Sequence, residues 1–139
     1  MGFAHLPDVV FRDPRWDDEV RVFGYPRVLG VTEQPITIER GDVVTQAAES
    51  PAVGGYPRHK VFLTSAIERP GNSGGPIVAR DGRVVGLVID HFRGGVSQAG
   101  AGPELADRSS ETPPFYRGIP GSEVVRAINE LCPDLAKLA

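Results

Sequence analysis

Residues 70–76 of this 139-residue chain read Pro-Gly-Asn-Ser-Gly-Gly-Pro, and residues 77–88 read IVARDGRVVGLV. Glycines on both sides of Ser73 allow a tight turn, because glycine adopts backbone angles that other residues avoid. Such a turn exposes the serine hydroxyl, as a nucleophile for acyl transfer requires. Two apolar runs then flank Arg80-Asp81-Gly82, and Asp-Gly is a strong β-hairpin signal. The stretch predicts an exposed serine followed by two paired strands, with a plain glycine-rich turn as the alternative.

Short strand-like runs recur on both sides of this stretch. They cover residues 19–23, 34–39, 43–45, 60–66, 76–79, 83–89 and 115–119. Turn signals separate them, among them Gly24-Tyr25-Pro26 and Arg40-Gly41-Asp42. Six or seven short strands in one chain are typical of a closed β-barrel or a sandwich. We therefore expect an all-β fold, a six- to seven-stranded antiparallel barrel, with residues 1–139 forming a single domain.

One segment follows a helical pattern instead. Its apolar residues lie on one stripe at helical spacing: Val124, Val125, Ile128 and Leu131. Ser122 can cap the start and Pro133 stops the helix, so we predict a C-terminal helix over residues 121–132 that packs on the barrel. Residues 94–114 contain almost no large apolar residue and are predicted to be a mobile loop, and residues 50–56 are predicted to be a loop tip.

Charge and composition exclude several classes of protein. The chain has 15 basic and 18 acidic residues, a formal net charge of −3, which gives no electrostatic reason to expect nucleic acid or membrane as a partner. Cys132 is the only cysteine, so no intrachain disulfide can form. The N-terminal sequence MGFAHLPD lacks the features of a signal peptide, and we predict a cytoplasmic protein. Three scattered histidines and one thiol give no metal-ligand spacing, and no cofactor is expected.

Residues 71–76, GNSGGP, resemble the nucleophile motif G-[DN]-S-G-G-P of the trypsin-like serine peptidases of chymotrypsin fold, especially the disulfide-free bacterial members. Residues 77–88 look like the strand pair that follows that motif. Phe23-Gly24-Tyr25-Pro26 is similar to the segment that ends the first strand of the family's second barrel, and residues 115–120 look like its closing strand. The resemblance covers about residues 16–131. It implies that the chain is the C-terminal barrel of such a peptidase.

The resemblance also implies a role for individual residues. Ser73 takes the position of the nucleophile, and the N–H groups of Gly71 and Ser73 take the oxyanion-hole positions. Two segments would form the walls of the primary specificity pocket, the second being the edge strand that pairs with an extended substrate. The residues in these walls are Ile67, Glu68, Ile89, Asp90 and His91. Glu68 and Asp90 are expected to favour a basic residue at the cleavage position.

The base that would activate Ser73 is not evident. In the resembled family the order along the chain is His, Asp, Ser, and an N-terminal barrel of roughly a hundred residues supplies the first two. No T-A-x-H-like segment precedes Ser73. His5 has only four residues before it, His59 reads as a solvated surface residue, and His91 follows the serine. A group of acidic residues before the first strand is expected to consist of solvated turn residues: Asp8, Asp13, Asp17 and Asp18.

These observations leave several hypotheses open. The first is a serine-type endopeptidase half that carries the nucleophile at Ser73, acts on a peptide or protein substrate and is inactive in isolation. Its missing N-terminal barrel would come from the rest of the parent protein or from another chain. The second is a non-catalytic peptide-binding module derived from such a barrel, and the third is a structural role in a larger protein. A rearranged triad within the chain is a further alternative, since triads occur in different chain orders.

Overall fold

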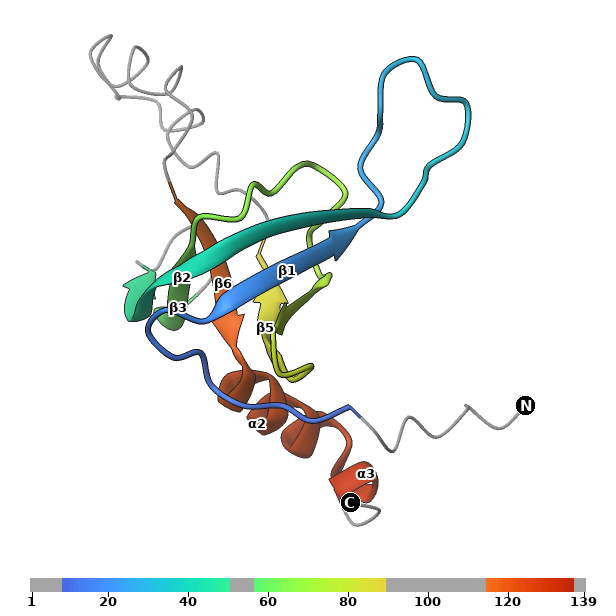
Figure 1. Ribbon diagram of the computed structural model, residues 1–139. Coiled ribbons are helices and arrows are strands. Elements are labelled where there is room, and N and C mark those ends of the chain that lie inside the picture. The colour runs from blue at the N-terminus through green and yellow to red at the C-terminus, as the bar shows by residue number, and fades with distance from the viewer. Residues whose placement is uncertain (1–8, 51–56, 90–114, 137–139) are drawn as a thin grey trace, which may run out of the picture.

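Six antiparallel strands close into a barrel in the computed structural model, which describes residues 9–50, 57–89 and 115–136 (Figure 1). The strands are β1 (Glu19–Gly24), β2 (Thr37–Ser50), β3 (His59–Thr64), β4 (Pro76–Ala79), β5 (Val84–Val88) and β6 (Tyr116–Pro120). Their order around the barrel is β1-β2-β3-β6-β5-β4, and β4 pairs with β1 to close it. The predicted antiparallel barrel is confirmed, with six strands. Of the loop tip predicted at residues 50–56, Ser50 is instead the last residue of β2 and pairs with His59, and residues 51–56 lie outside the described residues, as do residues 94–114.

A single long strand, β2, stands where the sequence predicted two strands and a turn at residues 40–42. Arg40 and Gly41 pair with β1 in regular register, and the second half of β2 pairs with β3 through two irregularities. Such bulges bend a strand, which lets β2 serve both neighbours. The main chain of Ala66 passes where a Cβ atom of residue 41 would stand, so this strand position requires glycine. The glycine permits this close approach and makes no turn.

The barrel interior is filled mainly by β-branched side chains. Alternate residues of β1, β4 and β6 are buried, as the period of a β-strand requires. The largest cluster of buried residues comprises Val20, Val22, Val43, Phe62, Ala66, Ile77, Ala79, Val85 and Val88. This packed interior gives the loops at the two ends of the barrel a rigid support.

Helix α2 (Gly121–Leu131) follows β6 and packs against β5 and β6 at one end of the barrel, and the short α3 (Pro133–Ala136) follows it (Figure 1). The predicted helix is present, but Ser122 does not cap it with its side chain. The N–H of Ser122 instead donates to the Asp13 carboxylate at 2.8 Å. Asp13 is exposed, as the sequence predicted, and its carboxylate also accepts a hydrogen bond from the first turn of α2. Neither described helix combines the length and apolar character that a membrane crossing requires.

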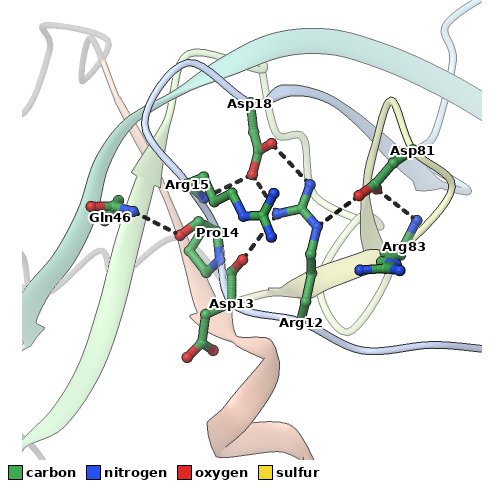
Figure 2. A network of polar contacts seen from close by, with 8 residues as sticks. All are labelled: Arg12, Asp13, Pro14, Arg15, Asp18, Gln46, Asp81 and Arg83. Atoms are coloured by element: carbon green, nitrogen blue, oxygen red, sulfur yellow. Dashed lines mark hydrogen bonds and ion pairs between the residues drawn. The ribbon is translucent and has the colours of Figure 1, made fainter.

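The N-terminal strap, residues 9–18, lies along the barrel and is held by hydrogen bonds at several points. The N–H of Val84 donates to the Val10 carbonyl at 2.9 Å, and the Arg12 N–H donates to the Val84 carbonyl at 3.1 Å. The Arg12 guanidinium donates to both carboxylate oxygens of Asp18, at 2.7 and 2.9 Å, and to Asp81 at 2.9 Å (Figure 2). The hydrogen bonds from Arg12 lower the pKa of Asp18 below its ordinary value. Asp18 is thus part of a structural network, and the expectation of a solvated residue was wrong.

Candidate active site

The serine loop, residues 65–75, joins β3 to β4 at the end of the barrel opposite α2 (Figure 1). Thr64, the last residue of β3, pairs with Tyr116 at the start of β6, whereas α2 begins where β6 ends. Within the loop Ser73 is exposed and its neighbour Asn72 is completely buried. The structure therefore places the Ser73 side chain at the surface, as the sequence predicted.

Two successive turns shape the loop around Ser73. The Asn72 N–H donates to the Arg69 carbonyl at 2.9 Å, and the Gly75 N–H donates to the Asn72 carbonyl at 2.9 Å. Gly71 and Gly74 have φ angles of 106° and 79°, in the left-handed region that favours glycine. The glycines on both sides of Ser73 are thus required by the backbone path.

The two short motifs noted in the sequence, around residues 23–26 and 70–76, contact one another. The Tyr25 N–H donates to the Gly71 carbonyl at 3.2 Å. A Cβ atom on Gly71 would lie 2.6 Å from the Tyr25 carbonyl oxygen and 2.8 Å from the Cα of Pro26. A larger residue at position 71 would overlap with the backbone that follows β1 and displace the serine loop. This contact therefore helps to fix the position of Ser73 relative to the barrel.

Backbone N–H groups beside Ser73 remain available to a ligand. Gly74 and Val88 are used within the fold, because the Gly74 N–H donates to the Val88 carbonyl at 2.8 Å and the Val88 N–H to the Gly75 carbonyl at 2.9 Å. Within the part of the chain that the structure describes, the N–H groups of Gly71 and Ser73 have no acceptor. Unpaired donors next to a serine are the groups that stabilise an oxyanion in acyl transfer.

Two of the predicted pocket residues belong to the serine loop itself. Ile67 is about half exposed, at 47%, whereas Glu68 is mostly covered and its Oε1 atom is inaccessible to water. This burial raises the pKa of Glu68 to about 8, although the positive charge of Arg117 opposes the shift. Ile89 follows β5 and donates its N–H to the Arg117 carbonyl at 3.2 Å. Asp90 and His91 lie outside the described residues.

The sequence of residues 2–87 matches the family of the trypsin-like peptidase domain. The chain belongs to the trypsin-like peptidase family. Crystal structures of the Rv3671c protease from M. tuberculosis have a similar fold. The active form gives a TM-score of 0.60 at 20% identity over 90% of this chain and 49% of that chain. The inactive form gives 0.59 at 21% identity over 93% and 57%. This chain therefore spans about half the length of these solved structures. No curated protein matches it.

His59, the histidine among the residues that the structure describes, does not belong to the serine loop. His59 begins β3, whereas the serine loop follows the other end of that strand, about 16 Å away at the usual rise per residue. The His59 ring nitrogen Nδ1 lies 3.1 Å from the Pro57 carbonyl oxygen, so the ring contacts the local backbone. His5 and His91 are outside the described residues. Within residues 9–50, 57–89 and 115–136 there is also no group of three His, Cys, Asp or Glu residues that could hold a metal ion.

Asn72 of the serine loop was not among the site residues predicted from the sequence. Its side chain is completely buried beneath the loop, and a Cβ atom on Gly24 would lie 2.7 Å from Asn72 Oδ1. Neither its Oδ1 nor its Nδ2 has a hydrogen-bond partner in the described structure. Its position between Gly71 and Ser73 was visible in the sequence, but the burial depends on the packing of the loop against the end of β1.

Proposed function

We propose that this chain is the nucleophile-bearing half of a trypsin-like serine endopeptidase and that the activating His and Asp come from polypeptide outside these 139 residues. The observation that carries the proposal is the exposed Ser73 on a glycine turn, next to the unpaired N–H groups of Gly71 and Ser73. Membership of the trypsin-like peptidase family supports it. The chain covers only about half of the length of the similar protease structures, which supports a source of His and Asp outside these residues.

The chemistry assigned to Ser73 is peptide-bond hydrolysis in two steps. Its Oγ attacks the scissile carbonyl carbon while a base removes the hydroxyl proton, and the carbonyl oxygen becomes an oxyanion held by the Gly71 and Ser73 N–H groups. The carbon–nitrogen bond then breaks, and the amine leaves with the proton returned by the base. Water, deprotonated by the same base, attacks the acyl-enzyme and releases the acid product and free Ser73.

Activity of the isolated chain is expected to be negligible, because a serine hydroxyl is a poor nucleophile without a positioned base. In the serine peptidase subtilisin, removing the base alone lowers kcat by a factor on the order of 10⁶. Binding and the oxyanion hole retain roughly 10³–10⁴ over water. His59 is the histidine of the described residues, and its place at the far end of β3 supports an external base.

The same proposal assigns substrate binding to the loop walls, with Ile67, Glu68 and Ile89 in the described residues and Asp90 and His91 beyond them. A carboxyl at position 68 favours a basic residue at the cleavage position only when it is ionised. Because the pKa of Glu68 is about 8, this preference should strengthen as the pH rises above neutrality.

The proposal is tested by incubating the purified 139-residue chain with a mixed peptide library and with a fluorophosphonate probe. We expect no cleavage above the Ser73→Ala variant and no probe adduct at Ser73. Cleavage that Ser73→Ala abolishes would show a base within the chain and would overturn the external-base part. Peptide binding that is unchanged in Ser73→Ala, together with no adduct in any larger assembly, would instead favour the non-catalytic binding module.

A further inference from the structure

Buried polar atoms without hydrogen-bond partners gather at one end of the barrel. In the described part of the chain they are Thr37 Oγ1, Thr64 Oγ1, Glu68 Oε1, Asn72 Oδ1 and Asn72 Nδ2. Thr37 begins β2 opposite Gly24, Thr64 ends β3, and the other two residues belong to the serine loop. All of them therefore lie at the end of the barrel that carries Ser73. Buried polar groups normally have a hydrogen-bond partner in the protein or in ordered water, so each of these atoms requires an explanation.

Glu68 differs from the other members of this group because it can ionise. A neutral carboxyl tolerates the covered position of its Oε1 atom, whereas ionisation is disfavoured there because this oxygen has no donor. This burial raises the pKa of Glu68 to about 8. At such a value about nine tenths of the side chains are protonated at pH 7 and about one tenth at pH 9. The charge of the serine loop thus changes within an accessible range of pH.

The charged groups around Glu68 determine where its carboxylate is drawn. Arg117 on β6 is the cation whose field favours ionisation, and its Nη1 also donates to Ser50 Oγ at 3.1 Å. On the loop itself, the Arg69 Nε donates to Glu39 of β2 at 3.4 Å. The ionised Glu68 would therefore move toward Arg117 or toward water, away from the site its neutral form occupies.

Anchors on both sides of Glu68 transmit such a movement to Ser73. Ser65 is fixed to β2 by two hydrogen bonds with Asp42, N–H to carbonyl at 3.0 Å and Asp42 N–H to Ser65 Oγ at 2.9 Å. On the other side, the Asn72 N–H donates to the Arg69 carbonyl at 2.9 Å. Glu68 thus lies between a residue fixed to β2 and a residue whose carbonyl is bonded to the turn that holds Gly71 and Ser73.

We propose that Glu68 is a proton-controlled positioning residue, whose neutral carboxyl keeps the serine loop packed on the barrel and whose ionisation shifts the N–H groups of Gly71 and Ser73. Only the effect of this shift on catalysis rests on the proposed function. The movement itself is a property of the isolated chain and can be measured without any catalysis, so the two proposals fail separately.

The test is an NMR titration of the 139-residue chain from pH 6 to pH 10. With ¹³C-labelled glutamate and ¹⁵N-labelled backbone, the Glu68 Cδ signal and the Gly71 and Ser73 amide signals should move with one common midpoint near pH 8. In Glu68→Gln the amide signals should stay constant over this range. Glu39→Gln, which removes the partner of Arg69 on the same loop, is the matched control and should leave the midpoint unchanged.

Three results would overturn the proposal. The first is a Glu68 Cδ signal that does not titrate between pH 6 and pH 10. The second is a set of loop amides that stay constant while Glu68 titrates, because the ionisation would then not be transmitted. The third is an amide titration that persists in Glu68→Gln. The first two are read in the unaltered chain, so the proposal stays testable even if a variant does not fold.

Discussion

Replacing Arg12 with methionine removes the guanidinium that ties the N-terminal strap to the barrel and keeps an unbranched apolar stem. Arg12 donates to both oxygens of Asp18 at 2.7 and 2.9 Å and to Asp81 at 2.9 Å (Figure 2). The side chains of Arg12 and Asp18 are only 11% and 15% exposed. Water therefore cannot fully replace the lost hydrogen bonds, and the variant leaves a poorly solvated carboxylate at Asp18.

The size of the effect follows from this burial. Removing one partner of a buried ion pair costs about 3–5 kcal/mol, and an exposed pair contributes about 0–1 kcal/mol. The slight exposure of Arg12 and Asp18 gives an expected loss of about 2–4 kcal/mol in the free energy of unfolding. For a domain of this size, about 3 °C of melting temperature corresponds to each kcal/mol, so the midpoint should fall by about 6–12 °C.

Thermal unfolding followed by circular dichroism measures this difference. Arg126→Met on α2 is the matched control, because Arg126 donates to Glu123 and Glu130 at 2.8 Å but is 61% exposed, and we expect no measurable shift there. The pKa of Asp18 is lower in the folded chain than in the unfolded chain, so ionised Asp18 stabilises the fold above about pH 4 and this contribution is lost as the pH falls. The difference in melting temperature between Arg12→Met and the unaltered chain should therefore shrink below about pH 4. Equal melting temperatures for Arg12→Met and the unaltered chain would refute a stabilising role of the strap.

Three further variants test separate parts of the structure. Because the pKa of Glu68 is raised from 4.5 to about 8, the free energy of unfolding should fall as the pH rises from 4.5 to 8. The urea midpoint of Glu68→Gln should not show this dependence on pH. An identical slope in the variant would contradict the burial. Gly41→Ala should lower the free energy of unfolding by about 1–3 kcal/mol, because the new Cβ atom would overlap with the main chain of Ala66. Gly30→Ala should lower it by about 1 kcal/mol, because Gly30 lies in open space but has a φ angle of 82°. Equal melting temperatures for the two variants would contradict the close approach between Gly41 and Ala66. Asp13→Ala should destabilise α2 by about 1 kcal/mol and speed its amide exchange, and unchanged exchange would show that Asp13 is not a cap.

Local patterns of the sequence predicted much of the barrel, because strand alternation and turn chemistry act over a few residues. The hairpin around Asp81-Gly82 and the helix after residue 120 follow from such signals. The turn predicted at residues 40–42 was wrong for a physical reason. Arg40-Gly41-Asp42 has the composition of a turn, but Gly41 pairs with Val20 of β1 and leaves room for the main chain of Ala66, twenty-five residues later in the sequence. A local reading cannot detect such a contact.

The candidate site was predictable to a similar extent. The exposure of Ser73 follows from the glycines around it, which act locally. The roles of Asp13 and Asp18 did not follow, because a helix cap and a bidentate partner of Arg12 arise only when distant segments meet. The pKa of Glu68 likewise depends on the charge of Arg117 in β6, which is almost fifty residues away. Polar residues with long-range partners therefore look like solvated residues in the sequence.

The most direct test of the proposed function is the mass of the Ser73-containing peptide after fluorophosphonate treatment, measured in parallel on two samples. One sample is the isolated 139-residue chain, and the other is the protein purified from the cells that produce it. We predict an adduct at Ser73 in the protein from cells and none in the isolated chain. An adduct in the isolated chain would contradict the external base, and the absence of an adduct in both samples would contradict the assignment of Ser73 as the nucleophile.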